Sequence, residues 1–172
     1  MAVVTSRVLF LCTGNYYRSR FAEHLFNHLA PHYELPWRAF SRGLATELVA
    51  EDAGPISPFA LYGLALRGIQ LEGQIRPPIQ LFEGDLASAH HIVALKQAEH
   101  LPLLRRTFPA WVERVEFWHV HDIDVAAPDD ALPHLEEAIR DLLNRLATGF
   151  EGRRSNGSAL GTPSVDEMKE VL

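Results

Sequence analysis

The first thirty residues change from an unbroken apolar stretch to apolar positions at helical spacing. Residues 7–12, RVLFLC, are apolar without alternation after the first position, which is typical of a parallel strand covered on both faces. Residues 19–30 then repeat apolar side chains every three or four positions and end before Pro31, which stops a helix. The pattern therefore predicts a buried strand, a short loop and a helix at the N-terminus.

The rest of the sequence repeats the order of strand and helix. Further strands are predicted at 37–43, 90–95 and 115–120, and helices at 57–69, 96–108 and 130–149. Such alternation predicts an α/β fold of three layers, in which a central four-stranded parallel sheet is flanked by helices. We expect residues 1–150 to form a single domain. Residues 151–172 are rich in Gly and Ser, which predicts a flexible tail.

Composition narrows the class of protein and its compartment. Hydrophobic residues make up 47% and charged residues 22% of the 172 positions, as in soluble globular proteins. The net charge of −6 argues against binding to nucleic acid or to an anionic membrane. The single cysteine excludes an intramolecular disulfide and fits a reducing compartment. We therefore expect a cytoplasmic protein that is a monomer or a weak dimer.

The single cysteine, Cys12, stands where the first strand ends, and parallel sheets bind ligands at the carboxyl ends of their strands. Gly14 and Asn15 allow a tight bend whose N–H groups turn inward around an anion. Arg18 offers a planar fork for two phosphate oxygens, and the helix from Ser19 directs its positive end to the same point. Cationic surroundings favour the thiolate, the nucleophilic form of cysteine. The loop therefore predicts a nucleophile inside a phosphate-binding cup.

Other interpretations of these residues were weighed against the phosphate cup. Cys12 could be a small buried side chain beside an unrelated surface arginine, but that leaves the strand, loop and helix around it unexplained. His24, His28 and His32 are spaced along a helix, but a proline interrupts it and no carboxylate or thiolate completes a ligand set. Two histidines within residues 119–122 lack a further ligand. We therefore predict no metal site.

The segment CTGNYYRS, residues 12–19, resembles the Cys-x5-Arg-Ser signature of the low-molecular-weight protein tyrosine phosphatases. The similarity continues at 39–44, 85–100 and 117–132, in the family's order of elements. It implies the family's fold, a four-stranded parallel sheet flanked by helices. It also implies a phosphomonoester hydrolase that acts on phosphotyrosine or related aryl phosphates, in phosphoproteins or small molecules, without a metal or cofactor.

The resemblance also implies a role for individual side chains. Cys12 would attack phosphorus to form a phosphocysteine, Arg18 would clamp the phosphate, and an aspartate would protonate the departing phenolate and later activate water. Asp122 aligns best with the family's acid, and Asp124 is the second candidate. The expected phosphate-binding residues are Thr13, Gly14, Asn15, Tyr16, Tyr17, Arg18 and Ser19.

The sequence departs from the family pattern at two places. Tyr17 occupies the position of a second cysteine that the family usually carries before the arginine. Asp122 is followed by Ile123 rather than by proline and aromatic residues, so Tyr16 and Tyr17 are the aromatic side chains left to contact a substrate ring. The altered acid motif keeps one alternative open, a phosphate- or phosphopeptide-binding module with weak or no catalysis. An arsenate reductase would need further cysteines, and a sulfurtransferase would carry its cysteine late in the domain.

The choice of general acid is testable by substitution. A phenol has a pKa of about 10, so its departure at neutral pH needs a proton. Asp122→Asn should lower turnover of phosphotyrosine by about 10²–10⁴-fold, the usual contribution of a positioned acid, and turnover of activated aryl phosphates by less. Asp124→Asn is the control and should lose little. The opposite ranking in steady-state kinetics would assign the acid to Asp124.

Overall fold

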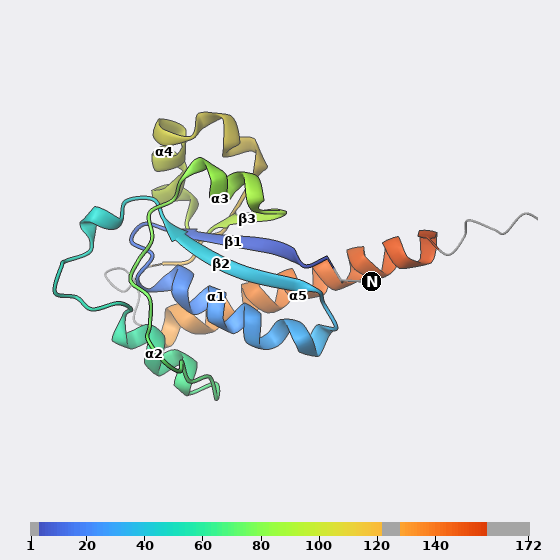
Figure 1. Cartoon of the computed structure of the whole chain (residues 1–172), viewed down its shortest axis with the longest axis horizontal. Coiled ribbons are helices and arrows are strands. Elements are labelled where there is room, and N and C mark those ends of the chain that lie inside the picture. The colour runs from blue at the N-terminus through green and yellow to red at the C-terminus, as the bar shows by residue number, and fades with distance from the viewer. Residues whose placement is uncertain (1–3, 122–127, 158–172) are drawn as a thin grey trace, which may run out of the picture.

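A computed structural model describes residues 4–121 and 128–157 and places four parallel strands in the order β2-β1-β3-β4 (Figure 1). The strands are β1 (Ser6–Cys12), β2 (Trp37–Gly43), β3 (His91–Ala94) and β4 (Val115–Phe117). The register pairs Cys12 with Gly43 on one side of β1 and Leu11 with Ala94 on the other. The predicted four-stranded parallel sheet is confirmed, with the apolar run of 7–12 in a central strand.

Helices cover both faces of the sheet, as expected. They are α1 (Arg18–Leu29), α2 (Pro58–Ala65), α3 (Glu83–Ser88), α4 (Gln97–Thr107) and α5 (Pro128–Gly157). Short 3₁₀ turns lie at Ala30–Tyr33, Thr46–Leu48 and Pro109–Arg114. Figure 1 shows α1, α2 and α5 on one side of the sheet and α3 and α4 on the other. Within the described ranges, every helix is too short or too polar to cross a membrane.

The two layers of helices enclose two separate hydrophobic cores. Because side chains alternate along a strand, Val8, Phe10 and Cys12 of β1 join the core with α1 and α5, while Leu9 and Leu11 join the core with α3 and α4. Each of the four apolar side chains of residues 8–11 is fully buried. The unbroken apolar sequence of β1 is thus explained by burial on both faces.

Several boundaries differ from those that the sequence predicts. The helix expected at 57–69 begins after the N-cap Ser57 but ends at Ala65, and Gly68 follows with a φ of 74° in the turn that leaves it. The short helix α3 was not predicted. The last helix continues to Gly157, so the expected domain boundary at residue 150 falls inside it, and residues 158–172 lie outside the described ranges.

The strand expected at 115–120 ends at Phe117, and the residues that follow remain beside the segment after β3. Trp118 N donates to Ala94 O at 2.8 Å, and Val120 N donates to Leu95 O at 2.7 Å. His119 forms an antiparallel bridge with Lys96. The segment after β4 thereby brings Val120 O to within 3.2 Å of Arg18 Nη1.

Packing at Gly63 of α2 gives a stability test. A Cβ added there would overlap Leu132 Cδ1 and approach Phe21 Cε2 to 3.2 Å. Helix propensity favours Ala over Gly by about 1 kcal/mol, but overpacking of a core costs about 1–3 kcal/mol. We expect Gly63→Ala to lower the free energy of unfolding in urea. Gly149→Ala in α5, where a Cβ meets no atom within 4 Å, should raise it, and equal effects would contradict the packing argument.

Candidate active site

The loop between β1 and α1 is held in place by the strand and segments beside it. Leu44 N donates to Cys12 O at 3.0 Å, and Ala45 N donates to Thr13 O at 2.8 Å. A Cβ on Gly43 would come within 3.0 Å of Asn15 N, so the absence of a side chain there lets β2 approach the loop closely. The end of β2 therefore supports the loop from one side.

Cys12 lies at the floor of this loop, next to the first turn of α1. Its side chain is only 2% exposed, and its Sγ is 2.9 Å from Ser19 Oγ. The N-terminus of α1, which begins at Arg18, carries the positive end of the helix dipole. A hydroxyl group and the N-terminus of a helix thus lie beside the sulfur.

Asn15 gives the loop its shape. Its φ is 51°, in the left-handed region that Asn tolerates better than most residues, and its side chain is fully buried. The amide Nδ2 donates to Ser19 Oγ and to Ser41 Oγ, each at 2.9 Å. Its Oδ1 accepts from Arg76 Nη1 and Ile79 N, each at 3.0 Å. Four hydrogen bonds therefore fix one side chain beneath the loop.

A second set of polar side chains surrounds Asn15 on the side of α1. Ser41 Oγ donates to a carboxylate oxygen of Glu23, which also pairs with Arg76 Nη2 at 2.9 Å. Arg76 comes from the long segment between α2 and α3, far from the loop in sequence. Sequence reasoning missed Glu23, Ser41 and Arg76, because no local pattern links them to the cysteine.

Arg18 is buried, with 2% of its side chain exposed, and is oriented from two elements. Its Nη2 donates to Glu99 Oε2 of α4 at 2.8 Å, and its Nη1 donates to Val120 O at 3.2 Å. Hydrogen bonds from His100 and then Arg18 lower the pKa of Glu99 to about 2, although partial burial opposes them. The clamp predicted at Arg18 therefore stands beside a carboxylate that is ionised at neutral pH.

A pocket of about 220 Å³ opens above Cys12. Tyr16 Oη donates to Ala53 O at 2.6 Å, and the Tyr17 ring lies 6.5 Å from the ring of Phe59. Asn15 and Ser19 lie beneath the pocket as supports. The described residues that line it are Cys12, Thr13, Gly14, Tyr16, Tyr17, Arg18, Leu48, Val49 and Ser57.

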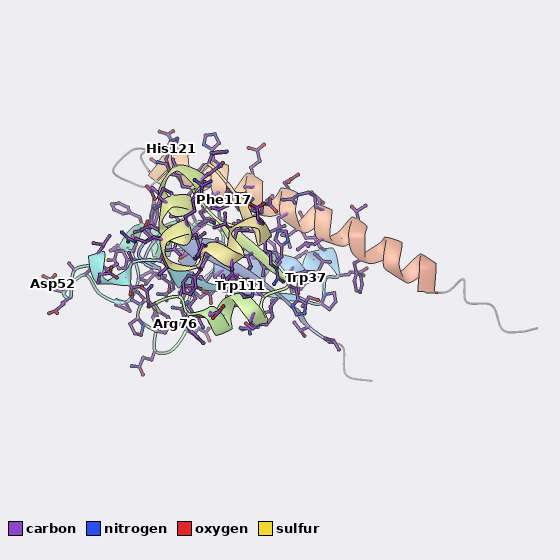
Figure 2. The ribbon with its side chains drawn as sticks, turned by 90° about the horizontal axis from the view of Figure 1, so that it is seen from above. Trp37, Asp52, Arg76, Trp111, Phe117 and His121 are labelled. Carbon is purple, nitrogen blue, oxygen red and sulfur yellow. The ribbon has the colours of Figure 1, made fainter. Side chains whose placement is uncertain are left out.

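Of the residues predicted to bind phosphate, Asn15 and Ser19 do not line this pocket, whereas the other five do. Leu48, Val49 and Ser57 were missed by sequence reasoning, because they reach the pocket from the segment after β2. Figure 2 shows Asp52, Arg76 and His121 toward one end of the molecule, and Trp37, the first residue of β2, toward the other. The candidate acids at positions 122 and 124 lie outside the described residues.

The histidines weighed as metal ligands do not form a metal site in the described part of the chain. No group of three His, Cys, Asp or Glu side chains there is placed to hold a metal ion. His28 and His32 lie with their rings 5.8 Å apart. The residue at position 122 that would extend the pair His119 and His121 is not described.

The support that Asn15 gives to the loop can be tested with Asn15→Ala. The change removes four hydrogen bonds and leaves an alanine at positive φ, so it should weaken binding of inorganic phosphate by at least about tenfold. Asn27→Ala is a matched control, because Asn27 bonds both backbone groups of Ala39 away from the loop. It should lower stability but keep phosphate affinity. Calorimetric titration decides, and unchanged affinity in Asn15→Ala would contradict a shaping role.

Comparisons with known proteins agree with this geometry. The family model described as low molecular weight phosphotyrosine protein phosphatase matches residues 7–152. No curated protein sequence matches the chain. The low molecular weight protein tyrosine phosphatase of T. tengcongensis is 25% identical with a TM-score of 0.65, and the match covers 84% of this chain and 99% of that one.

Two further solved structures share the fold at lower identity. SP-PTP, the low molecular weight protein tyrosine phosphatase of Streptococcus pyogenes, is 18% identical with a TM-score of 0.66, over 83% of this chain and 93% of that one. The YwlE arginine phosphatase of Geobacillus stearothermophilus is 21% identical with a TM-score of 0.63, over 88% and 96%. Because the family match spans most of the sequence, this chain belongs to the low molecular weight phosphotyrosine protein phosphatase family.

Proposed function

We propose that this phosphatase hydrolyses phosphotyrosine or a related aryl phosphate through a phosphocysteine on Cys12. The observation that carries the proposal is the position of the Cys12 sulfur. It lies at the floor of a pocket lined by Thr13, Gly14 and Arg18, 2.9 Å from Ser19 Oγ. A phosphate in that pocket would face the nucleophile and the positive end of α1 at once.

In the first step, the Cys12 thiolate attacks phosphorus and a P–S bond forms while the bond from phosphorus to the aryl oxygen breaks. The departing phenolate takes a proton from a general acid, for which Asp122 is the proposed residue. The Arg18 guanidinium would bind two oxygens of the transferring phosphoryl group, whose negative charge it neutralises.

In the second step, the acid residue, now a carboxylate, removes a proton from water, which attacks phosphorus and breaks the P–S bond. Inorganic phosphate leaves, and the thiolate is restored and stabilised by the Ser19 hydroxyl. The assignment of Asp122 is supported by its distance along the chain from Val120, whose carbonyl oxygen accepts from Arg18 at 3.2 Å.

The walls of the pocket favour an aromatic leaving group. Tyr16, Leu48 and Val49 supply ring and aliphatic surface above the cup, which suits the flat apolar face of a phenyl ring. A neighbour in fold is named an arginine phosphatase, but a guanidinium offers less apolar surface to these walls than a phenyl ring does. We therefore place phosphotyrosine ahead of phosphoarginine as substrate.

The wider setting is also part of the proposal. The substrate would be a phosphoprotein or a small aryl phosphate rather than a nucleic acid or a membrane lipid, since the net charge is −6. A single thiol that must remain reduced fits the cytoplasm. We propose that the protein acts there as a monomer or a weak dimer.

Hydrolysis of p-nitrophenyl phosphate tests the mechanism directly. Cys12→Ser should abolish turnover yet still bind inorganic phosphate, because the loop and Arg18 remain. Arg18→Ala should lose both turnover and phosphate binding. Appreciable hydrolysis by pure Cys12→Ser protein would exclude the phosphocysteine, and a wild-type protein that binds phosphate without hydrolysing any aryl phosphate would be a binding module instead.

A further inference from the structure

The Glu99 carboxylate is surrounded by several polar side chains, one of which is Arg18. Its Oε2 accepts from Arg18 Nη2 at 2.8 Å and from Thr13 Oγ1 at 3.4 Å, so it contacts both the clamp and the residue that follows the cysteine. His100 Nε2 lies 3.3 Å from the same oxygen. Lys96 Nζ is 3.8 Å from the other oxygen, Oε1. Glu99 itself is not one of the residues that line the described pocket.

His100 is held by the backbone beside the Glu99 carboxylate. The ring is fully buried, and its Nδ1 accepts a hydrogen bond from Lys96 N at 3.0 Å. The backbone at the start of α4 thus fixes the ring, whose Nε2 lies 3.3 Å from Glu99 Oε2.

Together these contacts set the plane of the guanidinium. One Nη of Arg18 donates to Glu99 and the other to Val120 O, so the group is anchored by α4 on one side and by the segment after β4 on the other. A guanidinium is rigid and planar with its donors in a fixed fork. Two anchored nitrogens therefore determine where its other N–H bonds point.

We propose that Glu99, which lies beside the buried His100, is a positioning residue that aligns Arg18 with the phosphoryl group in the transition state. This inference rests on the proposed function. During transfer the phosphoryl oxygens move from a tetrahedral arrangement toward a plane, and a fork held rigidly in advance matches the planar arrangement better. A mobile arginine would still attract phosphate by its charge, but its N–H groups would no longer be aligned with the planar phosphoryl oxygens of the transition state.

The proposal predicts a difference between two anions that bind the same cup. Orthovanadate becomes five-coordinate on a thiolate and resembles the transition state, whereas inorganic phosphate stays tetrahedral. In Glu99→Ala, kcat on p-nitrophenyl phosphate should fall by about 10²-fold with KM changed by less than about threefold, the scale that misplacement of a catalytic group produces. Vanadate affinity should fall by a similar factor, and phosphate affinity by less than about threefold.

Three further variants complete the experiment. His100→Asn, which removes the imidazole beside Glu99, should show the same split with a smaller loss, about tenfold. Glu99→Gln keeps the size of the side chain and one acceptor oxygen. If Glu99→Ala does not fold, this variant replaces it, and its kcat should fall by about tenfold. Glu113→Ala, at an exposed position before β4 and so at the opposite end of the strands, is the control and should change nothing.

The outcomes separate this inference from the proposed function. The positioning role would be overturned if phosphate and vanadate binding weakened equally. It would also be overturned if kcat were unchanged in folded Glu99→Ala and Glu99→Gln proteins. Neither outcome would affect the proposed function, provided that the wild type hydrolyses the substrate. Absence of hydrolysis by the wild type would overturn the proposed function itself. A parallel fall of kcat and vanadate affinity with phosphate affinity retained would support the positioning role.

Discussion

One buried side-chain amide holds the loop between β1 and α1 together. A polar group taken out of water without partners costs about 1–3 kcal/mol, and the Asn15 amide avoids that cost with four hydrogen bonds. Those partners come from α1, from β2 and from the segment before α3, so three separate parts of the chain must be in place before the loop is correct. The geometry around Cys12 is therefore a property of the whole fold.

Arginine side chains connect remote segments of the chain to α1 and to the loop between β1 and α1. Arg76 bridges Asn15 and Glu23, and Arg18 bridges Glu99 and Val120. Arg20 is buried and donates to the carbonyl oxygens of Pro55 and Arg76. Burial, followed by the charge of Arg76, lowers the pKa of Arg20 to about 10. Through these contacts, each guanidinium links α1, or the loop before it, to a part of the chain that is distant in sequence.

The sequence could predict what depends on neighbours along the chain. The central strand β1, the N-cap Ser57 and the apolar face of α5 follow from local patterns, and so does the loop, whose residues are consecutive from Cys12 to Ser19. Glu99 could not be found in this way, because its contact with Arg18 arises only when α4 packs beside the start of α1. Leu48 and Val49 could not be predicted for the same reason. Their segment is held beside the loop by hydrogen bonds of Ala45 N and Ala53 O with Thr13 and Tyr16.

The alternation of side chains along β1 has a consequence for how the site can vary. Cys12 shares a face with Val8 and Phe10, whereas Leu9 and Leu11 face the opposite layer. A register slip of one residue would exchange the two cores and turn the sulfur toward α3 and α4, away from Ser19 and the start of α1. Insertions or deletions within this strand are therefore incompatible with the site even where hydrophobicity is preserved. Insertions and deletions are compatible with the site only in the segments that connect the strands and helices.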